Sequence, residues 1–177
     1  MPATMARFQT SGTSRMPKSF PIVAWVSAAS LTSMVEEARR CLPNETGGAF
    51  MGYWAGPSTV VITDVIGPGP MAKHARHSFY PDAEYHDHEI ERIYVASDRL
   101  HTYLGDWHTH PNGSGTTSRR DRKTLSAIAS EAGARAPKPL MAILAGNEEW
   151  KLAIWSWRAK DFFWLAKVAL ASVTSFD

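Results

Sequence analysis

In the stretch Gly105-Asp-Trp-His-Thr-His-Pro-Asn-Gly-Ser-Gly-Thr-Thr-Ser-Arg-Arg-Asp121, two histidines precede a loop rich in Gly, Ser and Thr, and Ser-x-x-Asp closes it. We predict a strand over residues 101–107 before the loop and a helix over residues 118–131 after it. Residues i and i+2 of a strand point to the same side, so His108 and His110 can share a metal ion. Imidazole suits zinc, and a catalytic zinc needs three protein ligands and an open position.

Ser118 and Asp121 allow two interpretations, which do not exclude each other. A serine with an acidic residue three positions later, before an apolar periodic segment, is typical of a capping box at a helix start. A helix that starts after this loop can also return the carboxylate of Asp121 to the two imidazoles as a third ligand. Ser118 would then face the open position on the metal.

Glu45 precedes Gly47 and Gly48 in a predicted loop over residues 44–48, just before an apolar hairpin. A zinc hydrolase needs a base that takes a proton from water and returns it to the leaving amine. The two glycines allow close approach of the backbone, which a site that admits a peptide requires. Without the histidines, Glu45 would be an ordinary loop residue.

Together, these positions make a more specific pattern than any one of them, and the pattern contains Glu45, His108, His110, Ser118 and Asp121. The spacing Glu…His-x-His-x7-Ser-x-x-Asp resembles the motif of the JAMM/MPN-plus (JAB) metalloproteases. The resemblance covers roughly residues 27–157. The chain is most similar in its compact form to the bacterial JAB peptidases.

The resemblance implies a fold and a role for each motif residue. The fold would be α/β, with a single JAB/MPN-like (cytidine-deaminase-like) domain in which a mixed, curved β-sheet packs with helices. His108, His110 and Asp121 would bind one catalytic Zn²⁺ ion. Glu45 would orient and deprotonate a water in the fourth position, and Ser118 would donate a hydrogen bond to the oxyanion of the intermediate.

The resemblance also implies an enzymatic function. The protein would be a zinc-dependent isopeptidase or peptidase that cleaves after the C-terminal tail of a ubiquitin-like protein, in a conjugate or in a precursor. Its partners would be that ubiquitin-like protein and E1-like or E2-like proteins of the same system. Two alternatives stay open: a peptidase for a sulfur-carrier-type precursor, and a non-catalytic MPN-like binding or scaffold module.

Apolar patterning predicts the remaining elements. Strands are expected over residues 20–26, 49–54, 59–66, 138–145 and 150–157, and helices over residues 27–41 and 82–99. We predict an exposed loop from Gly67 to Ser78, followed by a brief strand at Phe79 and Tyr80. Residues 161–173 fit either a helix or a strand. Hairpins and single crossovers of this kind favour a three-layer or wrapped α/β sheet.

Several residues outside the motif could also carry chemistry. His86 and His88 lie on a predicted helix, where positions i and i+2 do not share a face, so we expect both to be solvated. His74 and His77 lie in the predicted loop and could flank a substrate channel. Asp106 is assigned a structural role.

The aromatic residues near the C-terminus are predicted to be core, and they are Trp150, Trp155, Trp157, Phe162, Phe163 and Trp164. The single cysteine, Cys41, is predicted to be structural, because buried cysteines are common and no histidine is close in sequence. One cysteine cannot form an intrachain disulfide.

The composition of the 177 residues limits partners and location. The net charge is only +2, which offers no support for a nucleic-acid partner, and the basic run from Arg119 to Lys123 is interpreted as a solvated helix face. Met1 to Lys18 lacks the apolar core of a signal peptide, and no apolar run reaches the ~18 residues of a membrane span. We therefore predict no membrane contact, a cytoplasmic location, a flexible tail over residues 1–18 and a catalytic domain over residues 19–177.

Overall fold

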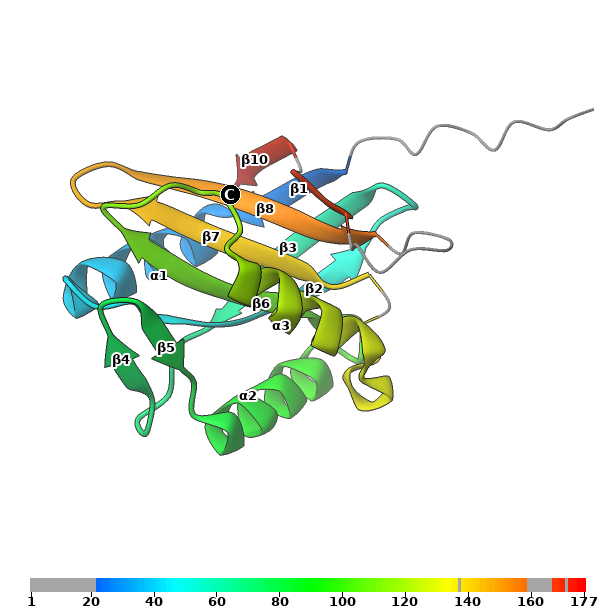
Figure 1. Ribbon diagram of the computed structural model, residues 1–177. Helices are drawn as coiled ribbons and strands as arrows, with labels where there is room; N and C mark the ends of the chain where they lie inside the picture. The colour runs from blue at the N-terminus through cyan, green and yellow to red at the C-terminus, as the bar shows by residue number, and fades with distance from the viewer. Residues whose placement is uncertain (1–21, 137, 159–166, 171) are drawn as a thin grey trace, which may run out of the picture.

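The fold is a curled mixed sheet with helices on both faces, as seen in a computed structural model that describes residues 22–136, 138–158, 167–170 and 172–177 (Figure 1). The helices are α1 (Ala28–Cys41), α2 (Ala83–Ala96), α3 (Arg119–Ser130) and a short 3₁₀ turn, η1 (Ala132–Ala134). Helix α1 covers one face of the sheet, and α2 and α3 lie on the other (Figure 1). The predicted tail, residues 1–18, lies outside the described residues.

Within the described part of the chain, the main sheet has eight strands in the order β10-β1-β3-β2-β6-β7-β8-β9. Their bounds are β1 (Val23–Ser27), β2 (Gly47–Trp54), β3 (Thr59–Ile66), β6 (Thr102–Pro111), β7 (Leu140–Gly146), β8 (Trp150–Arg158), β9 (Lys167–Leu170) and β10 (Ser172–Phe176). Strand β6 is central, antiparallel to β2 and parallel to β7. The sheet curls, because β10 at one edge also contacts β8 near the other. The predicted mixed, curved α/β sheet is therefore confirmed.

The hydrophobic core lies on both faces of the sheet, between the sheet and the helices that cover it. Met34 and Ala38 of α1 pack with Trp107 of β6 on one face of the sheet. On the other face, Ile93 of α2 packs over β2, and Leu125 of α3 packs over β7. The predicted strands and helices in the described ranges are confirmed, with shifts at their ends. None of the helices in the described part of the chain is both long and apolar enough to cross a bilayer.

The prediction of one exposed loop over residues 67–78 is wrong. Two short strands, β4 (Lys73–Ala75) and β5 (Ser78–Tyr80), form a hairpin within and beyond this segment. The hairpin is held at its base, because the backbone N–H of Glu45 donates to the carbonyl of Ala75 over 2.8 Å. A contact with a residue about thirty positions earlier is not visible in local sequence patterns.

Two further boundaries differ from the predictions. Helix α2 ends at Ala96 and not at Arg99, because Asp98 and Arg99 adopt positive φ values of 52° and 66° that end the helix. Within residues 161–173, which fit either a helix or a strand, the described positions belong to strands β9 and β10. Phe162, Phe163 and Trp164 lie outside the described residues.

Candidate active site

Strand β6 carries both histidines on one face of the sheet. Its central Trp107 and Thr109 are buried, and the indole N–H of Trp107 donates to the carbonyl of Ile66 over 3.0 Å. His108 and His110 point to the opposite face and line a cavity there. Strand β6 runs on to Pro111, so the histidines are part of the strand and not of the loop after it.

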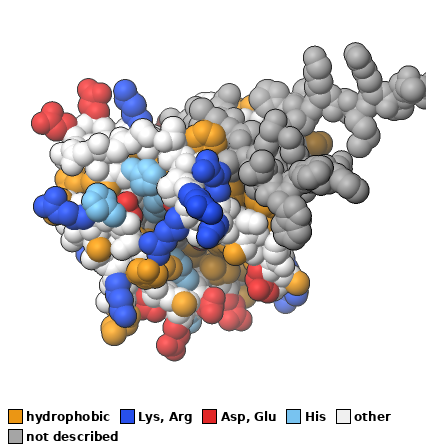
Figure 2. Space-filling model, in the orientation of Figure 1, with side chains coloured by type: hydrophobic (Ala, Val, Ile, Leu, Met, Phe, Trp, Pro, Cys, Tyr) orange, Lys and Arg blue, Asp and Glu red, His pale blue; other side chains and the backbone are white. Residues whose placement is uncertain are grey.

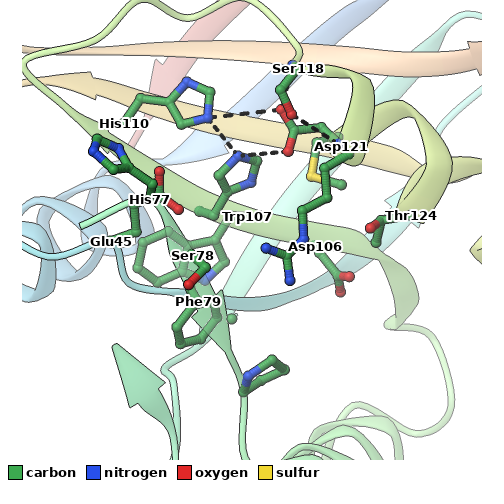
Figure 3. Close-up of a pocket in the computed structure, with 15 residues that line it drawn as sticks. Glu45, His77, Ser78, Phe79, Asp106, Trp107, His110, Ser118, Asp121 and Thr124 are labelled. Atoms are coloured by element: carbon green, nitrogen blue, oxygen red, sulfur yellow. Dashed lines mark hydrogen bonds and ion pairs between the residues drawn. The ribbon is translucent and has the colours of Figure 1, made fainter. Parts of the chain in front are cut away.

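Three potential ligand atoms converge above this strand. The Nε2 atoms of His108 and His110 are 3.0 Å apart. One carboxylate oxygen of Asp121 lies 3.4 Å from Nε2 of His108, and the other lies 3.8 Å from Nε2 of His110. All three ligand atoms lie within 4.8 Å of one another. Figure 3 shows His110 of β6 and Asp121 of α3 pointing toward each other.

Contacts around His108 and His110 leave each imidazole with a ring nitrogen that can bind a metal ion. Nδ1 of His110 is 2.8 Å from the carbonyl oxygen of Ser114, which can only accept a hydrogen bond, so Nδ1 carries the proton and Nε2 is free to bind a metal. Burial holds the pKa of His108 well below its ordinary value, against the opposing effect of Asp121. A neutral imidazole is the form that binds metals.

Helix α3 brings Asp121 to the histidines through the arrangement at its start. Ser118 is the N-cap, its hydroxyl accepts a hydrogen bond from the N–H of Asp121 over 3.1 Å, and its own N–H donates to Asp121 over 2.6 Å. The predicted capping box is therefore confirmed. The carboxylate of Asp121 is nearly buried and directs one oxygen to His108 and the other to His110.

Glu45 reaches the site because its neighbour Thr46 is clamped to β6. The N–H of Thr46 donates to the hydroxyl of Thr109 over 2.9 Å, and the N–H of Thr109 donates to the carbonyl of Thr46 over 2.8 Å. The hydroxyl of Thr46 also donates to Glu37 of α1 over 2.9 Å. Both threonines are fully buried, so these hydrogen bonds set the distance of Glu45 from the ligand-bearing strand.

Gly47 and Gly48 begin strand β2, where we predicted a loop. A Cβ atom at Gly47 would collide with the carbonyl oxygen of Trp107, and one at Gly48 would collide with the carbonyl oxygen of Ile66. The glycines are therefore required by the close approach of β2 to its two neighbours.

A cavity of about 370 Å³ joins these residues. Its lining includes all five motif residues, which are Glu45, His108, His110, Ser118 and Asp121. His77, Phe79 and Pro81 close it from the side of the hairpin, and Arg120 and Thr124 close it from α3. Histidine side chains gather near the centre of this face, beside the basic side chains of α3 (Figure 2). His77, which was expected to flank a substrate channel, lines this cavity.

Burial and local charges shift the pKa of Glu45. Burial raises the pKa of this carboxyl and the carboxylate of Asp121 raises it further, while His110 opposes the change. A raised pKa makes a carboxylate a stronger base, which suits a group that exchanges protons with a reacting molecule.

The donor set fits a divalent metal ion. Two imidazole nitrogens and a carboxylate are acceptor atoms, and a cation is needed to make their convergence favourable. Three protein ligands of this type, with a fourth position facing a cavity, match the pattern of a catalytic zinc. Within the described residues, this is the one group of His, Cys, Asp and Glu with such geometry.

One prediction about the other histidines is wrong. His86 is buried, and its Nε2 lies 2.9 Å from the carbonyl oxygen of Gly67, so it anchors the segment before the hairpin. His88 is exposed, as expected. Nδ1 of His74 donates to the carbonyl of Glu45 over 3.1 Å, so His74 supports the hairpin's hold on Glu45.

Asp106 and Cys41 make structural contacts. The hydroxyl of Tyr103 donates to Asp106 over 2.8 Å, and burial raises the pKa of the Asp106 carboxyl. The thiol of Cys41 contacts Glu37 over 3.0 Å. Trp155 and Trp157 pack against the core cluster under α3, as predicted for this aromatic group.

No role was predicted for Thr109. Because side chains alternate along β6, Thr109 points to the face opposite His108 and His110. Its position between the two histidines was therefore enough to predict that it is buried behind the site. Phe79 and Arg120 line the cavity, and Glu37 of α1 bonds the hydroxyl of Thr46, and no local pattern indicated these contacts.

The chain is similar in sequence to JAB-domain proteins and to a probable metalloprotease. The family model described as prokaryotic homologues of the JAB domain matches residues 27–160. A probable metalloprotease of Sinorhizobium fredii is 44% identical over 137 residues, which cover 76% of this chain and 84% of that protein. A CD-NTase/cGAS isopeptidase of Enterobacter hormaechei is 27% identical over 128 residues, covering 69% of this chain and 67% of that protein.

A solved structure supports the fold. A protein of Desulfitobacterium hafniense superimposes with a TM-score of 0.62 at 15% identity, over 88% of this chain and 94% of that protein. At this identity the likeness concerns the fold alone. The family match and the metalloprotease relative make the non-catalytic scaffold alternative the poorer explanation. The chain therefore belongs to the family of prokaryotic homologues of the JAB domain, and it is a JAB-type metallopeptidase.

Proposed function

We propose that the protein is a zinc-dependent isopeptidase or peptidase that cleaves after the C-terminal tail of a ubiquitin-like protein. The observation that carries the proposal is the convergence of three ligand atoms beside Glu45 and Ser118 in one cavity. His108, His110 and Asp121 would hold one Zn²⁺ ion. When bound, the ion would supply Lewis-acid activation of a water and of the scissile carbonyl.

Glu45 would act as the general base and then the general acid. Its carboxylate takes one proton from the attacking water, whose oxygen adds to the carbonyl carbon of the scissile bond. The C–N bond then breaks, and Glu45 passes the proton to the leaving amine nitrogen. The raised pKa of Glu45 helps it hold this proton between the two steps.

Ser118 would stabilise the oxyanion. Its oxygen already accepts the N–H of Asp121, and the hydroxyl proton remains to be donated to the substrate. One such donor contributes about 3 kcal/mol to lowering the barrier. Because Ser118 also caps α3, the donor is held in place by the helix.

The substrate class rests on relatives and on the shape of the site. Relatives in Enterobacter hormaechei and Escherichia coli are named CD-NTase/cGAS isopeptidases, which suggests a conjugate of a ubiquitin-like protein as substrate here. A cavity of about 370 Å³ between the hairpin and α3 suits an extended, glycine-rich tail. E1-like and E2-like proteins of the same system are the corresponding partners. We further propose that residues 19–177 form the catalytic domain.

The test combines metal analysis with two substrates. The purified protein should contain about one zinc per chain, and it should cleave a ubiquitin-like protein joined to a target lysine or extended at its C-terminus. Comparing the conjugate with the extended precursor separates deconjugation from processing. His108→Ala should lose the metal and the activity together, whereas Glu45→Gln should keep the metal and lose about 10²–10⁴-fold in kcat.

The control is Glu148→Gln, which removes one negative charge from the exposed turn between β7 and β8. It should behave as the unmodified protein. Full activity of Glu45→Gln, or of a His108→Ala protein without zinc, would contradict the proposal.

A further inference from the structure

A second cavity, of about 640 Å³, lies between α2 and α3 beside the catalytic cavity. Pro81 and Asp106 line both cavities, so the two share a wall. Asp106 lies two residues before His108, on the same face of β6. A peptide whose scissile bond lies at the metal ligands therefore has side chains within reach of this second cavity.

The wall of the second cavity is aliphatic with acidic groups. Ile90 of α2, Ile128 of α3 and Ala49 of β2 provide apolar surface. The carboxylates of Asp87, Asp106 and Glu131 line it as well. Among the described residues that line this cavity there is no lysine or arginine, in contrast to the catalytic cavity with its Arg120.

One of the three acids lies at the inner wall of the cavity, and the other two lie at its exposed rim. Asp106 lies at the wall shared with the catalytic cavity, where it accepts one hydrogen bond from Tyr103 and has the capacity to accept more. Asp87 on α2 and Glu131 at the end of α3 are exposed at the rim. In Figure 2, acidic side chains gather along the lower edge of this face, over α2, while the main group of basic side chains lies higher, over α3. A long side chain with an apolar stem and a positive end matches this order.

We propose that this cavity, lined by Ile90, Ile128, Asp87, Asp106 and Glu131 and here called the acidic side pocket, binds an arginine or lysine side chain of the peptide substrate. The inference rests on the proposed function, because it selects the tail sequence that the enzyme accepts. The aliphatic stem packs on the two isoleucines, and the charged end pairs with the carboxylates. Asp106 is less exposed than the two rim acids and lines both cavities, so a hydrogen bond from the charged end to Asp106 competes less with water than one to the rim.

The test measures peptide binding without cleavage. The full chain with Glu45→Gln is loaded with zinc and titrated with fluorescein-labelled alanine peptides that end in Gly-Gly. In each peptide, one alanine is replaced by arginine, lysine, norleucine or glutamate, and the replacement is made at each position in turn. At one position, arginine and lysine should bind about tenfold more tightly than norleucine, with glutamate the weakest.

Substitutions in the acidic side pocket identify where the preference arises. Adding Asp106→Asn, which retains the size of the side chain, should reduce the preference for a basic residue to under about twofold. The pair Asp87→Asn and Glu131→Gln should reduce it by a smaller factor, because rim charges are screened. Glu148→Gln again controls for the loss of one negative charge.

Two results would overturn the inference. One is the absence of any preference for arginine or lysine, including no measurable binding up to about 1 mM peptide. The other is a preference that persists in both sets of pocket variants. Because binding is measured in a variant that does not cleave, this outcome is separate from that of the hydrolysis test above.

Discussion

Ser118 shows how one residue can belong both to the fold and to the proposed chemistry. As the N-cap it exchanges hydrogen bonds with Asp121, and the same exchange holds the carboxylate near the two histidines. The two interpretations of Ser-x-x-Asp, capping and metal binding, are therefore compatible in this geometry. A substitution here needs to separate loss of the cap from loss of the proposed oxyanion donor.

Ser118→Ala should lower both stability and activity, and Ser118→Gly should lower mainly activity. Alanine at an N-cap costs about 1 kcal/mol, whereas glycine costs only a few tenths. Both remove the hydroxyl, so both should reduce kcat by about 10²-fold or more. Urea unfolding and steady-state kinetics measure the two effects. An unchanged kcat in the glycine variant would assign Ser118 to capping alone.

At the scale of elements, the close approach of β2 to β6 assembles the site. The Glu45 loop and the histidine strand are joined by the paired backbone and hydroxyl bonds of Thr46 and Thr109. The β4–β5 hairpin adds a third support, since Ala75 and His74 bond the backbone of Glu45. The proposed base is thus positioned by β6 and β4, two strands that are distant from it in sequence.

Gly47→Ala should destabilise the protein and disturb the metal site. The added Cβ would meet the carbonyl of Trp107, one residue before His108, so β2 must move away from the ligand strand. We expect a loss of about 2–4 kcal/mol in the free energy of unfolding and weaker zinc binding. Gly56→Ala is the matched control, because a Cβ there meets no atom within 4 Å. Equal free energies of unfolding for the two variants in urea would show that β2 can move away from β6 without loss of stability.

At the scale of the whole molecule, the proposed base is expected to reduce stability at neutral pH. Burial raises the pKa of Glu45 in the folded state above its ordinary 4.5. A raised folded pKa means that the protonated form is favoured by folding, and this stability is present below pH 4.5 and is lost as the pH rises through the folded value. At neutral pH the folded protein therefore carries an ionised carboxyl in an unfavourable environment.

Glu45→Gln should consequently stabilise the metal-free protein at pH 7, and the gain should shrink as the pH falls toward 4.5. Glu45 is only partly buried, so solvent screening keeps the expected gain at or below about 1 kcal/mol. Urea unfolding of EDTA-treated protein across this pH range measures it. A variant less stable than the unmodified chain at pH 7 would contradict the cause assigned to the pKa shift.

Local patterns allowed much of the fold to be predicted. The apolar hairpin of β2 and β3, the strand before the histidines and the helix capped by Ser118 each follow from residues close in sequence. The brief strand at Phe79 and Tyr80 was predicted, but the docking of the β4–β5 hairpin on Glu45 and the burial of His86 were not, since both depend on contacts with residues distant in the chain.

The set of candidate groups follows from local order along the chain, because His108 and His110 share one face of a strand and Asp121 stands at a helix start. Their convergence depends on the packing of elements that are distant along the chain. Asp121 lies near the imidazoles because α3 packs on β7, beside β6, and Glu45 lines the same cavity because Gly47 lets β2 approach β6. The acidic side pocket likewise exists only once α2 and α3 lie side by side on one face of the sheet. Spacing along a chain defines which groups are available, and packing of distant elements sets the distances on which metal binding and proton transfer depend.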